Sequence, residues 1–174
     1  MMTIRRLTGL LSVAVLLAGC PGMTYAQRTL PAVNVKQLDG KTTDLSKITN
    51  DGKPIILFVW EVSCQPSITE FNNVAKLYPR WKTETGVRIL AVSIDDNRSS
   101  SRVKPLSTSR GWGFDVYLDP NQDFKRAMNV PFCPYVFVLN GEGAVVWSKG
   151  GYTPGDEDVI YGIVQKTSKG EPVE

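Results

Sequence analysis

The sequence predicts one α/β domain, with a mixed β-sheet covered by helices on both faces. Apolar runs at 54–59 and 87–94 are typical of buried strands, and helical patterns alternate with them. A strand, turn and strand pattern over 134–147 adds a hairpin at the end, which makes the sheet mixed. The length of 174 residues suits one well-packed domain rather than two.

The first elements predict an N-terminal β-hairpin. Residues 33–36 alternate in polarity as an edge strand does, and Asp39-Gly40 is a strong hairpin turn signal. Residues 42–45 form either the returning strand or a helix cap. A second turn at 50–53 leads into the buried strand 54–59.

A helix is predicted after that strand. Apolar residues recur at three- and four-residue steps from Ile68 to Trp81, and Gly86 ends the pattern. The later elements are predicted from shorter patterns: a strand at 87–94, a weak helix at 99–110, a strand at 116–118, a helix at 123–128, strands on both sides of Asn140-Gly141, and a closing helix at 156–166.

The first 26 residues have the layout of a secretory leader. Arg5 and Arg6 are followed by the uncharged apolar stretch 7–19, which is too short for a permanent bilayer span. We therefore assign 1–26 to the leader and 27–174 to the folded domain, and expect export to the periplasm.

Two cleavage sites fit the leader. Residues 17–20, Leu-Ala-Gly-Cys, resemble a bacterial lipobox, which would end the signal at Gly19 and attach lipid to Cys20. Cleavage after Ala26 would instead leave a free protein. We favour the lipobox because all four of its positions fit, and we then expect the protein to be held at a membrane through the lipid on Cys20.

Charge excludes a nucleic-acid partner. Without Arg5 and Arg6, Lys plus Arg falls from 20 to 18 against 17 acidic residues, a net charge of +1. Nucleic-acid binding would require basic residues clustered on one face.

The chemistry must come from thiols and carboxylates. The chain has no histidine, which excludes Ser-His-Asp and Cys-His catalysis and the usual catalytic zinc sites. We expect no cofactor and no metal. Of the three cysteines, Cys64 and Cys133 belong to the domain, in a compartment where disulfides persist.

Cys64 lies where the strand 54–59 passes into the helix. The free N–H groups and the positive dipole end of a helix favour thiolate over thiol, as at redox cysteines. The alternative is a small buried cysteine without chemistry.

Several motifs match one family. From about residue 30 to 165 the chain resembles the thioredoxin-like thiol-disulfide oxidoreductases of the TlpA/ResA kind, in the redoxin superfamily. The resemblance implies a thioredoxin-like fold with a central mixed β-sheet flanked by helices and an N-terminal β-hairpin extension. The matching features are Asp39-Gly40-Lys41, Gly52-Lys53-Pro54, Trp60 four before Cys64, the segment 92–95 and the strand 134–140 that begins with proline.

The resemblance also implies roles for single residues. Cys64 would be the nucleophile, Pro134 a cis-proline packed against it, and Glu70 a buried carboxylate that carries protons. The alternative for Glu70 is an exposed carboxylate in the first helical turn that complements the dipole.

One motif position departs from the family. The second cysteine of the family is Ser67 here, so the motif is Cys64-Gln65-Pro66-Ser67. A hydroxyl cannot form a disulfide, but it can donate a hydrogen bond that stabilises a Cys64 thiolate. Ser67, Pro66 and Trp60 are therefore expected to support the site.

Cys133 can replace the missing thiol. In the family, the residue before the cis-proline lies beside the nucleophile, and here it is Cys133. A disulfide needs Cα atoms roughly 4.4 to 6.8 Å apart, which this placement could satisfy. We predict that Cys64 and Cys133 form the redox pair; the alternatives are a permanent structural disulfide and an unpaired buried thiol.

The sequence therefore predicts an exported thiol-disulfide oxidoreductase that acts on protein or small-molecule thiols and disulfides. The alternative is a monothiol or non-catalytic thioredoxin-like module that binds a protein, or Cu(I) through Cys64, Cys133 and Met128. A peroxiredoxin is disfavoured, since Glu61 and Leu57 stand where that chemistry wants a hydroxyl residue and a proline.

Overall fold

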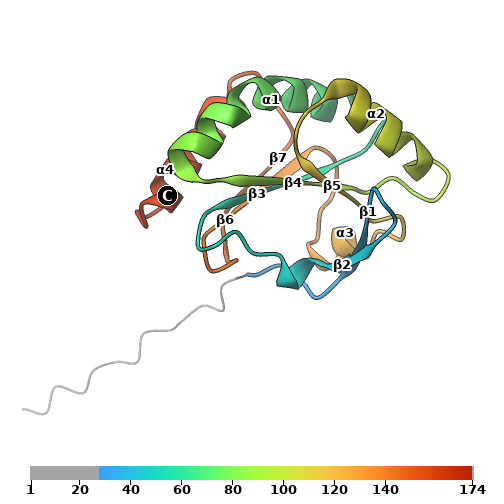
Figure 1. Cartoon of the computed structure of the whole chain (residues 1–174), viewed down its shortest axis with the longest axis horizontal. Helices are drawn as coiled ribbons and strands as arrows, with labels where there is room; N and C mark the ends of the chain where they lie inside the picture. Colours follow the sequence, from blue (N-terminus) through green and yellow to red (C-terminus); the bar gives the residue numbers. More distant parts are fainter. Residues whose placement is uncertain (1–27, 174) are drawn as a thin grey trace, which may run out of the picture.

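The computed structural model describes residues 28–173 (Figure 1). The expected leader, Cys20 and both expected cleavage sites lie outside the described residues. No helix within 28–173 is long and apolar enough to cross a bilayer.

Seven strands form one mixed sheet in the order β2-β1-β5-β4-β3-β6-β7. β4 lies between β3 and β5 and pairs with both in parallel. Every other pairing in the sheet is antiparallel. The predicted α/β class and mixed sheet are confirmed. The strands are β1 (Asn34–Gln37), β2 (Thr42–Asp44), β3 (Ile55–Trp60), β4 (Arg88–Ser93), β5 (Asp115–Leu118), β6 (Tyr135–Leu139) and β7 (Val145–Gly150).

Helices cover the two faces unequally. Three helices, α1, α2 and α4, pack on one face, and the short α3 and η1 lie on the other (Figure 1). The helices are α1 (Gln65–Thr85), α2 (Val103–Arg110), α3 (Asp123–Ala127) and α4 (Asp156–Ser168), with 3-10 turns η1 (Leu45–Lys47) and η2 (Ser100–Arg102).

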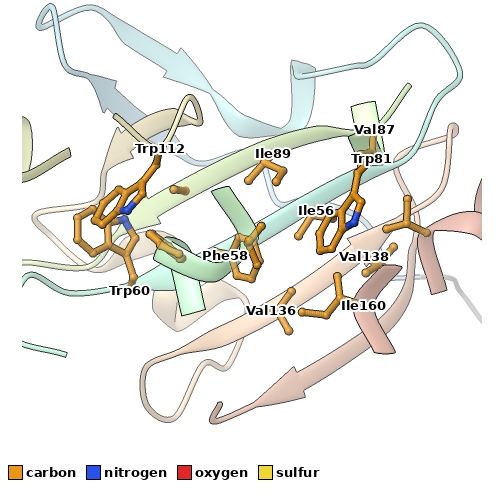
Figure 2. Packing of buried hydrophobic residues seen from close by; sticks show 14 of the residues in the cluster. Ile56, Phe58, Trp60, Trp81, Val87, Ile89, Trp112, Val136, Val138 and Ile160 are labelled. Atoms are coloured by element: carbon orange, nitrogen blue, oxygen red, sulfur yellow. The ribbon is translucent and has the colours of Figure 1, made fainter. Parts of the chain in front are cut away.

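The central strand β3 supplies both halves of the core. All six of its side chains are buried, because the sheet is covered on both faces. Ile56, Phe58 and Trp60 face α1 and α4, where Figure 2 shows them in line with residues of the neighbouring strands. The alternate side chains of β3 pack under α3 and η1. β3 is therefore packed on both faces, and this fixes the position of its C-terminal end, from which the chain continues to Cys64.

The long helix α1 has the predicted bounds. Pro66 is its second residue, where a missing N–H costs no intrahelical bond. Gly86 ends the helix in the left-handed conformation at φ 70°, and its N–H donates to the Lys82 carbonyl over 2.9 Å.

The predicted N-terminal hairpin forms, with Gly40 at φ 89° in its turn. The two alternatives for 42–45 are both realised, because β2 ends at Asp44 and the Asp44 carboxylate then caps η1 by accepting from Ser46 N–H.

The predicted Asn140-Gly141 turn is longer than two residues. β6 ends at Leu139 and β7 begins at Val145, and the Asn140 side chain accepts from the N–H groups of Glu142 and Ala144. The predicted hairpin therefore forms, with a loop that the side chain of Asn140 organises. In that loop, a Cβ on Gly141 would lie 2.1 Å from the carbonyl oxygen of Gly52.

Candidate functional site

Cys64 is the N-cap residue of α1, at the predicted junction after β3. Its N–H donates to the Glu61 carbonyl over 3.0 Å, and its carbonyl accepts from Ile68 over 3.2 Å. The side chain is partly exposed. The sulfur therefore lies at the positive end of a 21-residue helix, within reach of a partner from solvent.

Cys133 lies directly before Pro134 and β6, and the Cys133–Pro134 peptide bond is cis, as the resemblance implied. β6 runs antiparallel to β3, with Val59 opposite Tyr135. The end of β3 and the start of β6 therefore lie side by side, and this brings the segments that hold Cys64 and Cys133 together.

The Cys64 side chain affects the pKa of the Cys133 thiol. Burial, a hydrogen bond to Cys64, the negative charge of Cys64 and, least, the Glu61 carboxylate together raise the pKa of Cys133 to about 12. Both cysteines are free thiols in this structure. Cys133 therefore keeps its proton to a higher pH than an ordinary thiol does.

Glu70 lies buried in the second turn of α1, with 1% of its surface exposed. The alternative of an exposed first-turn carboxylate is therefore wrong. Burial and the charges of Asp156 and Glu157, opposed by Lys149, raise the pKa of Glu70 to about 8. Its Oε2 has no hydrogen-bond partner among the described residues. Glu70 therefore holds a proton near neutral pH.

Ser67 does not make the expected hydrogen bond to Cys64. The residue is fully buried, and its Oγ has no partner within residues 28–173. The hydroxyl lies inside the protein whereas Cys64 is partly exposed, so the serine does not cap the thiol. The expectation of a thiolate held by Ser67 was wrong for this state.

Trp60 supports the site from below. It is fully buried and packs against Phe71 at 5.3 Å and against Trp112 at 5.4 Å between ring centroids. Figure 2 shows Trp60 and Trp112 together at one end of the core. The indole N–H of Trp112 donates to Asn72 Oδ1 over 2.9 Å. These contacts hold the first turns of α1 on β3.

The side chains around Glu70 were missed by sequence reasoning. Asp156 and Glu157 begin α4, the predicted closing helix. Lys149 pairs with Asp156, and Tyr152 donates to Glu157 Oε1 over 2.7 Å. No short motif links these residues to Glu70, because they are about 80 positions away in the chain.

A polar hollow of about 380 Å³ opens beside the segment that precedes Cys64. Its lining includes Glu61, Ser63, Asp95 and Arg102.

The metal alternative depended on Met128. Within residues 28–173 no group of three His, Cys, Asp or Glu side chains is placed to hold a metal ion. Met128 lies buried in the core under α3, among apolar side chains.

Comparisons with known proteins identify the family of the chain. Residues 26–148 match the AhpC/TSA family. The thiol-disulfide oxidoreductase ResA of Bacillus subtilis (strain 168) is 32% identical over 116 residues, which are 67% of this chain and 62% of ResA. The chain therefore spans less than two thirds of the length of this curated relative.

Solved structures share the fold. The solution structure of an uncharacterized thioredoxin-like protein from Porphyromonas gingivalis has a TM-score of 0.73 and 43% identity, and the match covers 80% of this chain and 92% of that one. A putative thiol:disulfide interchange protein DsbE from Chlorobium tepidum has a TM-score of 0.71 at 20% identity, over 82% and 96%. The fold is thioredoxin-like, and the chain belongs to the AhpC/TSA redoxin family.

Proposed function

We propose that this protein is an exported thiol-disulfide oxidoreductase in which Cys64 is the nucleophile, Cys133 the resolving thiol and Glu70 the proton carrier. The observation that carries the proposal is the meeting of Cys64 and Cys133 at the adjacent ends of β3 and β6. The names of ResA and DsbE, both thiol-disulfide proteins, support the class of reaction.

The first step is attack of the Cys64 thiolate on a substrate disulfide. One substrate sulfur becomes bonded to Cys64, and the other leaves as a thiolate. Glu70, protonated near neutral pH, supplies the proton that neutralises the leaving thiolate. Glu70 is then a carboxylate.

The second step resolves the mixed disulfide. Once Cys64 is bonded to substrate it has no charge, so two of the effects that kept the proton on Cys133 are removed. Cys133 passes its proton to Glu70 and attacks the sulfur of Cys64. The Cys64–Cys133 disulfide forms, the second substrate thiolate leaves and takes a proton from water. The substrate has gained two electrons, and an external dithiol reductant must return the pair to thiols.

The location follows from the leader. We infer that residues 1–26 direct export and that lipid on Cys20 holds the protein at the periplasmic side of a membrane. The partners are protein or small-molecule disulfides on that side, where disulfides persist.

Alkylation trapping tests the chemistry. The full chain carrying Cys20→Ser, which removes the third thiol, is incubated with a model disulfide, quenched in acid, alkylated and mapped by mass spectrometry. We expect a Cys64–Cys133 bridge in oxidising buffer and two alkylated cysteines in reducing buffer.

Matched variants assign the roles. Cys133→Ser should accumulate the mixed disulfide on Cys64, and Cys64→Ser should form no adduct at all. A protein that forms no Cys64–Cys133 bridge in either buffer refutes the resolving role. Mixed disulfides that an added thiol releases would then assign it to the monothiol class.

A further inference from the structure

The charges of Asp156, Glu157 and Lys149 act on Glu70, Tyr152 is bonded to Glu157, and the thiol steps use none of these four side chains. Asp156 and Glu157, in the first turn of α4, are 8% and 7% exposed. Lys149 approaches from β7, and Tyr152 from the loop between β7 and α4. Charged groups are rarely buried together unless they are paired.

The four side chains form two linked pairs. The Lys149 ammonium pairs with Asp156 Oδ2, which also accepts from the N–H of Thr153 over 2.7 Å. The Tyr152 hydroxyl donates to Glu157 Oε1 over 2.7 Å and accepts from Asn73 over 2.8 Å. Asn73 lies three residues after Glu70 on α1, so this network connects the helix of Glu70 to α4.

The titratable side chains that act on Glu70 come from α4, from β7 and from the loop between β7 and α4. Asp156 and Glu157 face it from α4, Lys149 from β7 and Tyr152 from the loop. β3, on which α1 packs, carries no titratable side chain over Ile55–Trp60. Glu70 itself has one oxygen without a partner among the described residues, so neighbouring charge rather than a fixed hydrogen bond acts on that oxygen.

We propose that Lys149, Asp156 and Glu157 are positioning residues that control proton gain and loss at Glu70, with the Lys149–Asp156 pair as the principal control. The inference deepens the proposed function and rests on it for the role of Glu70 as proton carrier. The carboxylates of Asp156 and Glu157 favour the protonated form of Glu70, and the ammonium of Lys149 favours the ionised form.

The two halves of the ion pair must act in opposite directions. Lys149→Met removes the nearby cation and leaves the Asp156 carboxylate unpaired, so the pKa of Glu70 should rise. Asp156→Asn removes an anion and leaves the ammonium unpaired, so that pKa should fall. A pair that only held β7 to α4 would be broken equally by both changes, and both would move Glu70 the same way.

The experiment titrates Glu70 directly. The full chain with Cys20→Ser is labelled with ¹³C at the glutamate carboxyl carbons, and the Glu70 resonance is assigned by its loss in Glu70→Gln. Its chemical shift is then followed from pH 4 to 10. We expect Lys149→Met and Asp156→Asn to move the midpoint in opposite directions by about one pH unit each.

Controls separate charge from packing. Lys149→Arg keeps the charge and should leave the midpoint unchanged. Arg88→Met breaks another ion pair, Arg88 with Asp115, and should also leave it unchanged. If Lys149→Met does not fold, Glu157→Gln replaces it and should lower the midpoint. Shifts of Lys149→Met and Asp156→Asn in the same direction, a rise in Glu157→Gln, or shifts no larger than that of Arg88→Met would overturn the proposal.

The same variants keep this inference distinct from the proposed function. The rate of Cys64–Cys133 bridge formation is measured across the same pH range. If the carboxyl midpoint moves as expected while the pH profile of bridge formation does not follow, the control of Glu70 holds and its proton-carrying role is lost. If the midpoint does not move, the inference fails whatever the bridge does.

Discussion

The two thiols of the site differ in what surrounds them. Cys64 stands at a helix N-terminus and is partly exposed, whereas the proton of Cys133 is held by burial and by the hydrogen bond and charge of Cys64. In the proposed reaction this difference sets the order of events, with Cys133 acting as a nucleophile after Cys64 has reacted.

Removing the Cys64 sulfur should activate Cys133. In Cys64→Ser the charge and the thiolate hydrogen bond are gone, so the pKa of Cys133 should fall below about 12, although burial still raises it. We expect the alkylation rate of Cys133 at pH 8 to increase about tenfold over its rate in the parent chain. An unchanged rate would mean that burial alone controls Cys133.

Glu70 should make stability depend on pH. Its pKa is about 8 in the folded protein against an ordinary value of 4.5, so between these values the folded state binds more protons than the unfolded state. The free energy of unfolding should therefore be highest below pH 4.5 and fall by up to about 1.4 kcal/mol per pH unit as the pH rises toward 8. Glu70→Gln should abolish this fall, and urea unfolding of both proteins at pH 5 and pH 8 measures it.

At the scale of elements, aromatic packing fixes the position of the first turns of α1, the helix that Cys64 caps. Phe71 of α1 packs edge to face on Trp112 and tilted on Trp60, and Trp60 packs edge to face on Trp112, with each pair at 5.0 to 5.4 Å between centroids. Edge-to-face aromatic pairs contribute about 0.5–1.5 kcal/mol beyond their buried area. The helix start is thus held in place before any substrate arrives.

The first turn of α1 also predicts the effect of restoring a cysteine at 67. Ser67 is fully buried, and its hydroxyl has no partner within the described chain, so Ser67→Cys gives up no hydrogen bond and places a small apolar group in the core. We expect unchanged or higher stability and a new disulfide between positions 64 and 67 that competes with the Cys64–Cys133 bridge. Disulfide mapping by mass spectrometry of the oxidised variant measures the ratio. Exclusive formation of the old bridge would mean that the first turn cannot bring positions 64 and 67 together.

At the scale of the whole molecule, the two cysteines divide the chain. A bridge between them closes a loop that contains all of α1, β4, α2, β5 and α3. Oxidation should therefore affect the unfolding of the entire domain.

The loop length sets the size of that effect. For a loop of about 69 residues, chain entropy predicts that the oxidised protein is more stable by about 4 kcal/mol. Guanidinium unfolding of the oxidised and reduced Cys20→Ser chain should show the difference, and Cys133→Ser should show none. Equal midpoints in both states would indicate a bridge that strains the folded protein.

The sequence predicts the sheet, α1 and the reactive junction, because apolar period and turn residues are local signals. The position of Cys133 came from the family resemblance rather than from spacing. The partners of Glu70 could not be predicted, since Lys149 and Asp156 reach it through tertiary packing of β7 and α4. The expected Ser67 bond was wrong for a similar reason: the direction of a buried hydroxyl depends on the core around it, which a motif does not describe.

The close approach of Gly141 to Gly52 has a practical consequence. These loops lie at the ends of β3 and β6 opposite the cysteines, and no side chain fits between them. A fluorophore, an affinity tag or new chain termini placed at this pole would push the two strands apart and so shift the spacing of Cys64 and Cys133 at their other ends. Reporters for this protein belong on the exposed outer face of α2 instead, where Lys104 and Ser109 are exposed.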